Sequence, residues 1–324
     1  MNMHPASISN DTDAIVQQIN ILRREKNAVI LAHYYQDQSV QEIADYIGDS
    51  LGLSQQAAQT EADLIVFAGV YFMAETAKII NPSKKVLLPD LNAGCSLADG
   101  CSAQDVLDLK RRYPNHKVVS YVNCSAEVKA VSDIICTSAN AEAVICSFSP
   151  DEQLIFVPDK NLGRYLVNKT GREMKLWEGA CIVHEAFSIE KLLDLHAQNP
   201  TAEIIAHPES EAHILKVATY IGSTAGMINY VRESRNNTFI VATEEGILHE
   251  MGKMVPSKQL IPAPTREDNS CACSQCAFMR LTTLEKILNC LQHETPEIVL
   301  DNDLAERARI PIQRMLDLSR VSIL

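Results

Sequence analysis

Residues 31–52 read LAHYYQDQSVQEIADYIGDSLG, and residues 205–226 read IAHPESEAHILKVATYIGSTAG. Aligned without gaps at a constant offset of 174, the two stretches share seven identical residues over the 21 positions 32–52. Chance alignment of unrelated stretches would give about one or two. The identities fall at Ala32, His33, Ala44, Tyr46, Ile47, Gly48 and Gly52. The sequence therefore predicts an internal repeat.

A third, more divergent copy lies between these two. At an offset of 88, His33 aligns with Tyr121, and Ser50 aligns with Ser138. The copies start at residues 33, 121 and 207, and a hydroxyl residue stands 17 positions after each start, as Ser50, Ser138 and Thr224. We predict three domains: residues 1–110 with an N-terminal helix, residues 111–197, and residues 198–324 with the C-terminal helices.

Within each copy, short apolar runs alternate with segments of helical periodicity. In the first copy, Ala28–Ala32 and Leu64–Ala68 read as buried strands. Ser39–Glu42 has the pattern of a capping box, and Val40, Ile43, Ala44 and Ile47 follow it at helical spacing. Continuous apolar strands between helices are typical of parallel sheets covered on both faces. We predict an α/β fold of three homologous αβα units, each with a small parallel sheet, around a pseudo-threefold axis.

Composition and charge exclude several classes of function. The formal net charge is −12, and the sequence pI is about 5.2. Nucleic-acid binding depends on neutralising phosphates, so we expect no nucleic-acid partner. The longest apolar runs fall far short of the roughly 20 residues of a membrane helix, and residues 1–10 lack the pattern of a secretory signal. We expect a cytoplasmic protein with no membrane association.

The chain has ten cysteines, a number that points to metal binding or catalysis in a reducing compartment. Cys136, Cys146 and Cys290 stand in apolar or helical stretches, so we predict that they are core residues. The last predicted strand of each copy is followed by cysteine. These residues are Cys95 in the first copy, Cys181 in the second, and Cys271, Cys273 and Cys276 in the third.

One thiolate from each copy could converge on a single metal centre. Three thiolates suit a 4Fe–4S cluster whose fourth iron is open to substrate as a Lewis acid. The spacing alone leaves two alternatives. One is zinc held by Cys271, Cys273, Cys276 and a fourth ligand, and the other is a set of unrelated thiols.

The motifs resemble those of the quinolinate synthase family over nearly the whole chain, from about residue 28 to residue 290. They occur in the family's order: LAHYYQ (31–36), GDSL (48–51), FMAETA (72–77), LPD (88–90), GCSLA (94–98), YVN (121–123), CTSAN (136–140), HPE (207–209), GST (222–224) and the Cys276 loop with Met279.

The resemblance implies a transferase of NAD biosynthesis. Such an enzyme condenses iminoaspartate with dihydroxyacetone phosphate and releases quinolinate, phosphate and water. It also implies a 4Fe–4S cluster held by Cys95, Cys181 and Cys276, with one open iron. Ala277-Phe278-Met279 marks Cys276 as the third ligand, although alanine replaces the more usual proline. Cys271 and Cys273 are then spare thiols. An L-aspartate-oxidising enzyme would supply iminoaspartate.

Tyr35 and Glu209 occupy the same repeat position, and we predict that Glu209 is a general base and Tyr35 a proton donor or acceptor. The alternatives are an ordinary half-buried tyrosine and a helix cap. His33 and His207 end equivalent strands, so we predict that they donate hydrogen bonds to substrate. The second copy supplies Tyr121 and Asn123 at the corresponding place.

Hydroxyl groups complete the predicted site. Ser50, Ser138 and Thr224 stand where helices are expected to begin, a position that suits a carboxylate or phosphate. The alternative for these residues is simple N-capping. The remaining histidines read as surface or packing residues: His4, His116, His184, His196, His213, His249 and His293.

Two other functions are compatible with an open cluster. The first is a hydro-lyase of the aconitase type, which the repeated His/Tyr/Glu pattern disfavours. The second is a non-enzymatic iron–sulfur sensor, which would need a DNA- or protein-binding element that the sequence does not display.

Overall fold

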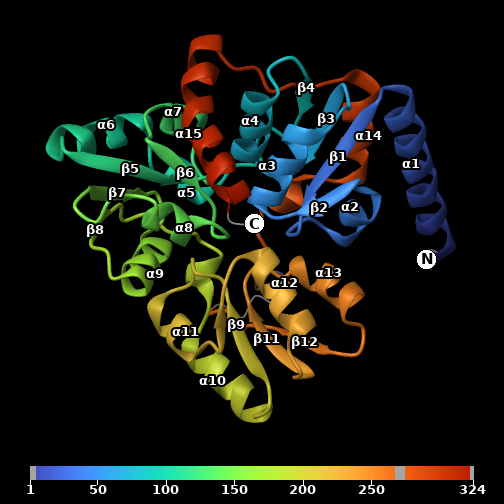
Figure 1. The fold of residues 1–324 in the computed structure, drawn as a ribbon. Coiled ribbons are helices and arrows are strands. Elements are labelled where there is room, and N and C mark those ends of the chain that lie inside the picture. Colours follow the sequence, from blue (N-terminus) through green and yellow to red (C-terminus); the bar gives the residue numbers. More distant parts are fainter. Residues whose placement is uncertain (1–4, 267–273, 322–324) are drawn as a thin grey trace. The chain divides into compact units, whose positions relative to one another are not determined.

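The structure, a computed structural model, describes residues 5–266 and 274–321 (Figure 1). Cys271 and Cys273 lie outside the described residues. The chain divides into two compact units. The first comprises Met1–Gly94 and Ala277–Leu300, and the second comprises Cys95–Cys276 and Asp301–Leu324.

The first unit contains one parallel sheet of four strands in the order β2-β1-β3-β4. Its strands are β1 (Ala28–His33), β2 (Tyr46–Gly48), β3 (Leu64–Ala68) and β4 (Lys85–Leu87). Its helices are α1 (Pro5–Glu25), α2 (Gln38–Ile43), α3 (Ser50–Gln59), α4 (Tyr71–Ile80), the short η2 (Met279–Leu281) and α14 (Leu284–His293). Every residue of β3 is buried, as expected for a strand covered on both faces.

The second unit contains two more parallel sheets, ordered β6-β5-β7-β8 and β10-β9-β11-β12. The strands of the former are β5 (His116–Tyr121), β6 (Ile134–Cys136), β7 (Gln153–Val157) and β8 (Met174–Leu176). Those of the latter are β9 (Glu203–Ala206), β10 (Tyr220–Ile221), β11 (Thr238–Ala242) and β12 (Gln259–Pro262).

The helices of the second unit surround these two sheets. They are α5 (Ser96–Asp99), α6 (Ala103–Arg112), α7 (Ala126–Ala130), α8 (Ala141–Cys146), α9 (Lys160–Thr170), η1 (His184–Ala186), α10 (Ile189–Gln198), α11 (Ala212–Val217), α12 (Thr224–Glu233), α13 (Ile247–Met254) and α15 (Asn302–Val321). None of the helices in the described part of the chain has the length and apolar character to cross a membrane.

The three sheets share one strand order, which confirms the predicted α/β fold of three αβα units. Equivalent hydrogen bonds recur in them. The amide N of Asp45 donates to the Ile30 carbonyl, and the amide N of Asp133 donates to the Val118 carbonyl, each at 2.9 Å. The amide N of Thr219 makes the corresponding bond in the third copy. The pseudo-threefold axis and the domain boundaries at residues 110 and 197 stay predictions.

The two C-terminal helices pack on the first two sheets. Helix α14 packs against α1 and β3 within the first unit, whereas α15 packs against β6 and α7 within the second (Figure 1). Both helices fall in the predicted third domain, residues 198–324. The apolar face of each helix therefore covers a sheet that is distant in sequence.

Three local predictions were wrong. Helix α2 begins at Gln38 and is capped by Asp37, whose side chain accepts from the Ser39 amide, so Ser39 is not the cap of a capping box. Ile47 lies in β2, because α2 ends at Ile43. Cys146 is exposed at the end of α8, not in the core, whereas Cys136 and Cys290 are fully buried as predicted.

Candidate active site

A buried carboxylate, Glu209, lies just after β9 and forms the centre of the candidate site. Its side chain accepts a hydrogen bond from the hydroxyl of Tyr121 at the end of β5. Nδ1 of His184 lies 3.1 Å from its Oε2, and Nδ1 of His207 lies 3.7 Å from its Oε1. The end of β5, the turn after β9 and the short helix η1 thus bring four polar side chains together inside the second unit.

In both imidazoles, the ring nitrogen Nε2 also has a polar neighbour. Nε2 of His184 lies 2.9 Å from the hydroxyl of Thr243, and Nε2 of His207 lies 3.0 Å from the hydroxyl of Ser138. The two rings lie 4.8 Å apart between centroids. Because each ring nitrogen has a polar neighbour, both rings are held in place and oriented toward Glu209.

The charge of Glu209 depends on opposing effects on its pKa. Burial alone would raise the pKa of Glu209, but the charges of His184 and His207 and the hydrogen bonds from His184 and Tyr121 hold that pKa well below its ordinary value. Glu209 is therefore ionised. Nearby Asp159 shows the opposite: its burial and the charge of Glu209 raise its pKa well above the ordinary value. Among the described residues, Asp159 Oδ2 has no hydrogen-bond partner.

Cys95 and Cys181 lie near the same carboxylate, and Cys276 lies near Cys95. Sγ of Cys181 lies 3.2 Å from Nδ1 of His184. Burial raises the pKa of the Cys95 thiol to about 12, and the negative charges of Glu209 and Cys276 add to the effect. Burial, Glu209 and Cys95 likewise raise the pKa of the Cys181 thiol. Cys95 thus lies close enough to Cys181 and to Cys276 for the thiolate forms to repel one another, a situation that a metal cation would relieve.

The loops that carry these cysteines are bound to one another. The hydroxyl of Ser96 donates to the Ala180 carbonyl at 3.4 Å and accepts from the Ile182 amide at 3.3 Å. It therefore joins the loop of Cys95 to both neighbours of Cys181. The amide of Cys276 donates to buried Glu244 at 3.2 Å. These bonds hold the three thiols at fixed positions without using the sulfur atoms.

One set of side chains in the described part of the chain is compact enough for a single ion. The ligand atoms of Cys181, His184 and Glu209 lie within 4.8 Å of one another. Cys95 and Cys276 belong to no such compact set.

The first unit carries His33, Tyr35 and Ser50. The amide of Tyr35 donates to His33 Nδ1 at 3.1 Å, and the two rings lie 4.4 Å apart. The amide of Glu209 makes the same bond to His207 Nδ1 at 3.4 Å in the second unit. The repeat equivalence of Tyr35 and Glu209 therefore extends to their backbone geometry.

The predicted hydroxyl residues differ in position. Ser50 and Thr224 are the first residues of α3 and α12, but the caps are Asp49 and Ser223, so simple N-capping is not their role. Ser138 lies in a turn ahead of α8, against His207. Asn123 is half-buried, and within the described chain its Oδ1 has no hydrogen-bond partner.

Of the predicted residues in the second unit, the structure joins Tyr121, Ser138, His207 and Glu209 by direct contacts. Sequence reasoning missed His184, Thr243 and Asp159. His184 was predicted to be a surface or packing residue, although its spacing of three residues from Cys181 could have revealed it. No comparable signal marks Thr243 or Asp159.

Comparison with known proteins identifies one family. The family model described as quinolinate synthetase A protein matches residues 17–317. A quinolinate synthase of Microcystis aeruginosa is 57% identical over 98% of this chain and 99% of its own length. A quinolinate synthase of Synechocystis sp. is 58% identical over 94% of this chain and 95% of its own length.

Proposed function

This chain belongs to the quinolinate synthetase A family, and we propose that it condenses iminoaspartate with dihydroxyacetone phosphate to form quinolinate, phosphate and water. The family and its relatives support an enzyme that acts as a quinolinate synthase in NAD biosynthesis on small-molecule substrates. The structural observation that carries the proposal is the buried Glu209, held between two imidazoles beside three thiols.

Cys95, Cys181 and Cys276 are the proposed ligands of a 4Fe–4S cluster with one open iron. Three features support this assignment: one thiol comes from each copy of the repeat, the thiols interact electrostatically, and their loops are hydrogen-bonded to one another or to buried carboxylates. Such a centre supplies a Lewis acid that binds and polarises substrate oxygens. His184 Nδ1, 3.2 Å from the Cys181 sulfur, would orient that ligand.

Glu209 and its two imidazoles are the proposed acid/base group. Because its pKa is low, the Glu209 carboxylate stays charged and stabilises a proton on His184 or His207. The hydroxyl of Tyr121 completes a hydrogen-bonded chain along which a proton can move to or from the substrate. Dehydration and imine formation both need such transfers.

The remaining predicted residues bind substrate in this proposal. Ser138 orients His207, and Asn123 offers a carbonyl oxygen that has no partner among the described residues. Ser50 and Thr224 present hydroxyl groups in the first turns of α3 and α12, where backbone amides favour anions. His33 and Tyr35 contribute a hydrogen-bond donor and a proton donor or acceptor.

An assay of purified protein under anaerobic conditions tests the reaction. The protein is supplied with dihydroxyacetone phosphate and freshly generated iminoaspartate, and quinolinate is measured by chromatography. We expect quinolinate in proportion to the iron content, and none from a Cys181→Ala control. Tyr35→Phe should retain iron and lose turnover. Formation of no quinolinate by iron-loaded protein would reject the proposal.

The cytoplasmic location and the supply of iminoaspartate by an L-aspartate-oxidising enzyme stay predictions. Mixing this protein with such an enzyme, L-aspartate and dihydroxyacetone phosphate tests the second of these. Quinolinate should then form without added iminoaspartate.

A further inference from the structure

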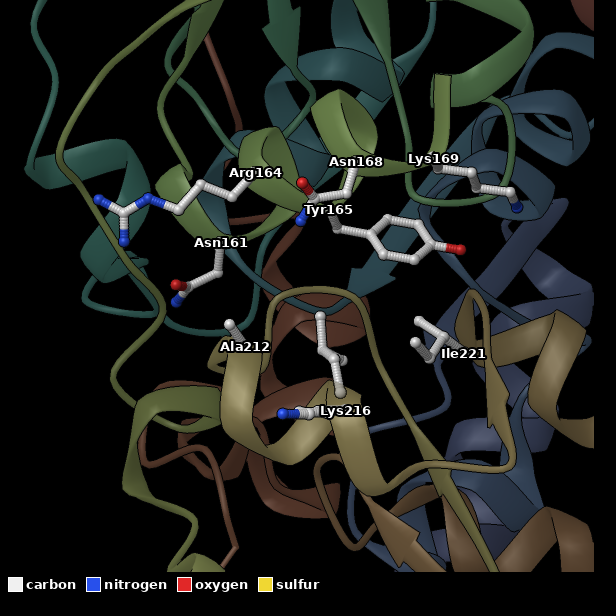
Figure 2. A pocket seen from close by; sticks show the side chains of 9 residues that line it. Asn161, Arg164, Tyr165, Asn168, Lys169, Ala212, Lys216 and Ile221 are labelled. Atoms are coloured by element: carbon white, nitrogen blue, oxygen red, sulfur yellow. The ribbon is translucent and has the colours of Figure 1, made fainter. Parts of the chain in front are cut away.

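A cavity whose lining does not include Glu209 lies between α9 and α11 within the second unit (Figure 2). Its volume is about 600 Å³, within the usual range for sites that bind small molecules. Helix α9 contributes side chains at i, i+3, i+4 and i+7, so a complete helix face is turned toward the cavity. The lining residues are Asn161, Arg164, Tyr165, Asn168, Lys169, Ala212, Leu215, Lys216 and Ile221.

The cavity is positively charged in an acidic protein. Its lining includes Arg164, Lys169 and Lys216 and no carboxylate, although the chain has 41 acidic and 29 basic residues. Lys169 pairs with Glu142 at 2.7 Å and lies 5.5 Å from the centre of the Tyr165 ring. Lys169 is therefore occupied in positioning that ring.

The other two cations are available to an anion. Lys216 forms no ion pair or hydrogen bond with any residue that the structure describes. Arg164 contacts Glu178 at 3.2 Å, but both side chains are more than half exposed, so solvent screens the pair and a better ligand can replace it. Phosphate is such a ligand, because a guanidinium and an ammonium group together match its charge and geometry.

The part of the cavity away from Arg164 and Lys216 is aromatic and aliphatic. Figure 2 shows the ring of Tyr165 with Ile221 at one end of the cavity; Asn161 and Lys216 face each other from α9 and α11 nearer the other end, and the Arg164 side chain extends outward beyond Asn161. Tyr165, Leu215 and Ile221 offer an aromatic face and aliphatic surface, on which a planar ring can stack. The amide of Asn168, on the same helix as Tyr165, can hydrogen-bond to the edge of a heterocycle.

Asn161 shows that the site is built into the fold. Its side chain is 5% exposed and donates to Glu185 at 3.5 Å, next to His184 of the candidate active site. It also follows Asp159, the cap of α9, by two residues. A ligand that contacts Asn161 would thus touch the segment that leads to Glu209.

We propose that this cavity binds a small molecule in which a planar ring is joined to a phosphate group, the chemistry of a nucleoside monophosphate. The phosphate binds Arg164 and Lys216, and the ring packs on Tyr165, Leu215 and Ile221. This inference does not depend on the proposed catalytic function.

Isothermal titration of the full-length protein, handled anaerobically, tests the proposal with three probes. AMP carries both ring and phosphate, adenosine carries only the ring, and inorganic phosphate carries only the anion. We expect AMP to bind with a dissociation constant below about 1 mM and at least about tenfold more tightly than either fragment. Absence of AMP binding at that concentration would overturn the proposal.

Two double variants, each of which removes two positive charges, locate the binding site. Arg164→Gln with Lys216→Gln should weaken AMP binding at least about tenfold. The matched pair, Arg232→Gln with Lys253→Gln, removes one exposed arginine and one exposed lysine from α12 and α13 and should change the affinity less than about twofold. Ala212→Phe, which fills the cavity without a change of charge, should also abolish binding. Equal affinity in all variants would place AMP elsewhere and refute the assignment.

Discussion

Nδ1 of His184 lies 3.1 Å from the Glu209 carboxylate and 3.2 Å from the Cys181 sulfur; His184 and Glu209 are buried, and Cys181 is partly buried. A proton on Nδ1 can be donated to the carboxylate, while Nε2 faces the Thr243 hydroxyl. His184 thus couples the candidate acid/base group to the candidate metal centre. A substitution in the acid/base group should therefore affect the metal centre, and a substitution at the metal centre should affect the acid/base group.

Removal of the Thr243 hydroxyl should weaken that coupling. Thr243→Val keeps the shape of the side chain but leaves His184 Nε2 without its neighbour, so the ring loses a fixed orientation. We expect quinolinate formation to fall about 10- to 100-fold with little change in melting temperature. His184→Gln should lower it at least as far. Thr238→Val, at the start of β11, the strand that Thr243 follows, is the control and should keep full activity.

Loss of the Glu209 charge should lower turnover more than loss of the Thr243 hydroxyl. Glu209→Gln leaves two imidazoles without their counter-ion, and we expect turnover to fall by about 10²- to 10⁴-fold, as for loss of an acid/base group. Tyr121→Phe removes only the hydroxyl donor and should cost less. Both variants should keep their iron, and Tyr113→Phe, a half-buried tyrosine of the second unit, should resemble the wild type. Full turnover of Glu209→Gln would contradict its role.

Asp159 should destabilise the fold at neutral pH. Its pKa is raised in the folded state, so its contribution to stability is most favourable below the unfolded pKa of about 3.9 and declines as pH rises toward the folded value. Asp159→Asn should therefore raise the melting temperature at pH 7, and the gain should shrink as pH approaches 4. Thermal unfolding across this range measures the effect.

Asp105 provides a control of opposite sign. Hydrogen bonds from Ser102 lower its pKa, so its contribution is present above the unfolded pKa and is lost as pH falls through the folded value. Asp105→Asn should lower the melting temperature at pH 7, and the loss should disappear in acid. If the melting temperatures of both variants changed in the same direction with pH, the environments assigned to Asp159 and Asp105 would be wrong.

Three cysteines should prove necessary for iron binding. Replacement of Cys95, Cys181 or Cys276 by alanine removes one thiol from the interacting set and should abolish retention of iron and acid-labile sulfide. Two matched controls test specificity: Cys290 is buried in the core around α14, and Cys146 is exposed. Cys290→Ala and Cys146→Ala should keep full iron content and visible absorbance. Zinc in place of iron after anaerobic growth would contradict the cluster.

Much of the fold could be predicted because its signals are local or periodic. Apolar runs such as Leu64–Ala68 specify buried strands, and the repeat at offsets 88 and 174 specifies three similar units. The local errors concern the first and last residues of the short helix α2. Asp37 caps α2 in place of Ser39, and Ile47 follows the helix into β2, because one extra residue decides where a six-residue helix starts or ends.

The amino-acid sequence by itself determined the three-unit α/β architecture, the repeat-equivalent strand ends and the presence of cysteine after the last strand of each copy. Only the tertiary structure decided which side chains meet. Tyr121 contacts Glu209 across 88 residues, and His184 contacts Glu209 from a separate loop. Such contacts follow from the packing of whole elements, in which the burial of apolar faces fixes where polar side chains converge; no local pattern around Thr243 or Asp159 predicts that outcome.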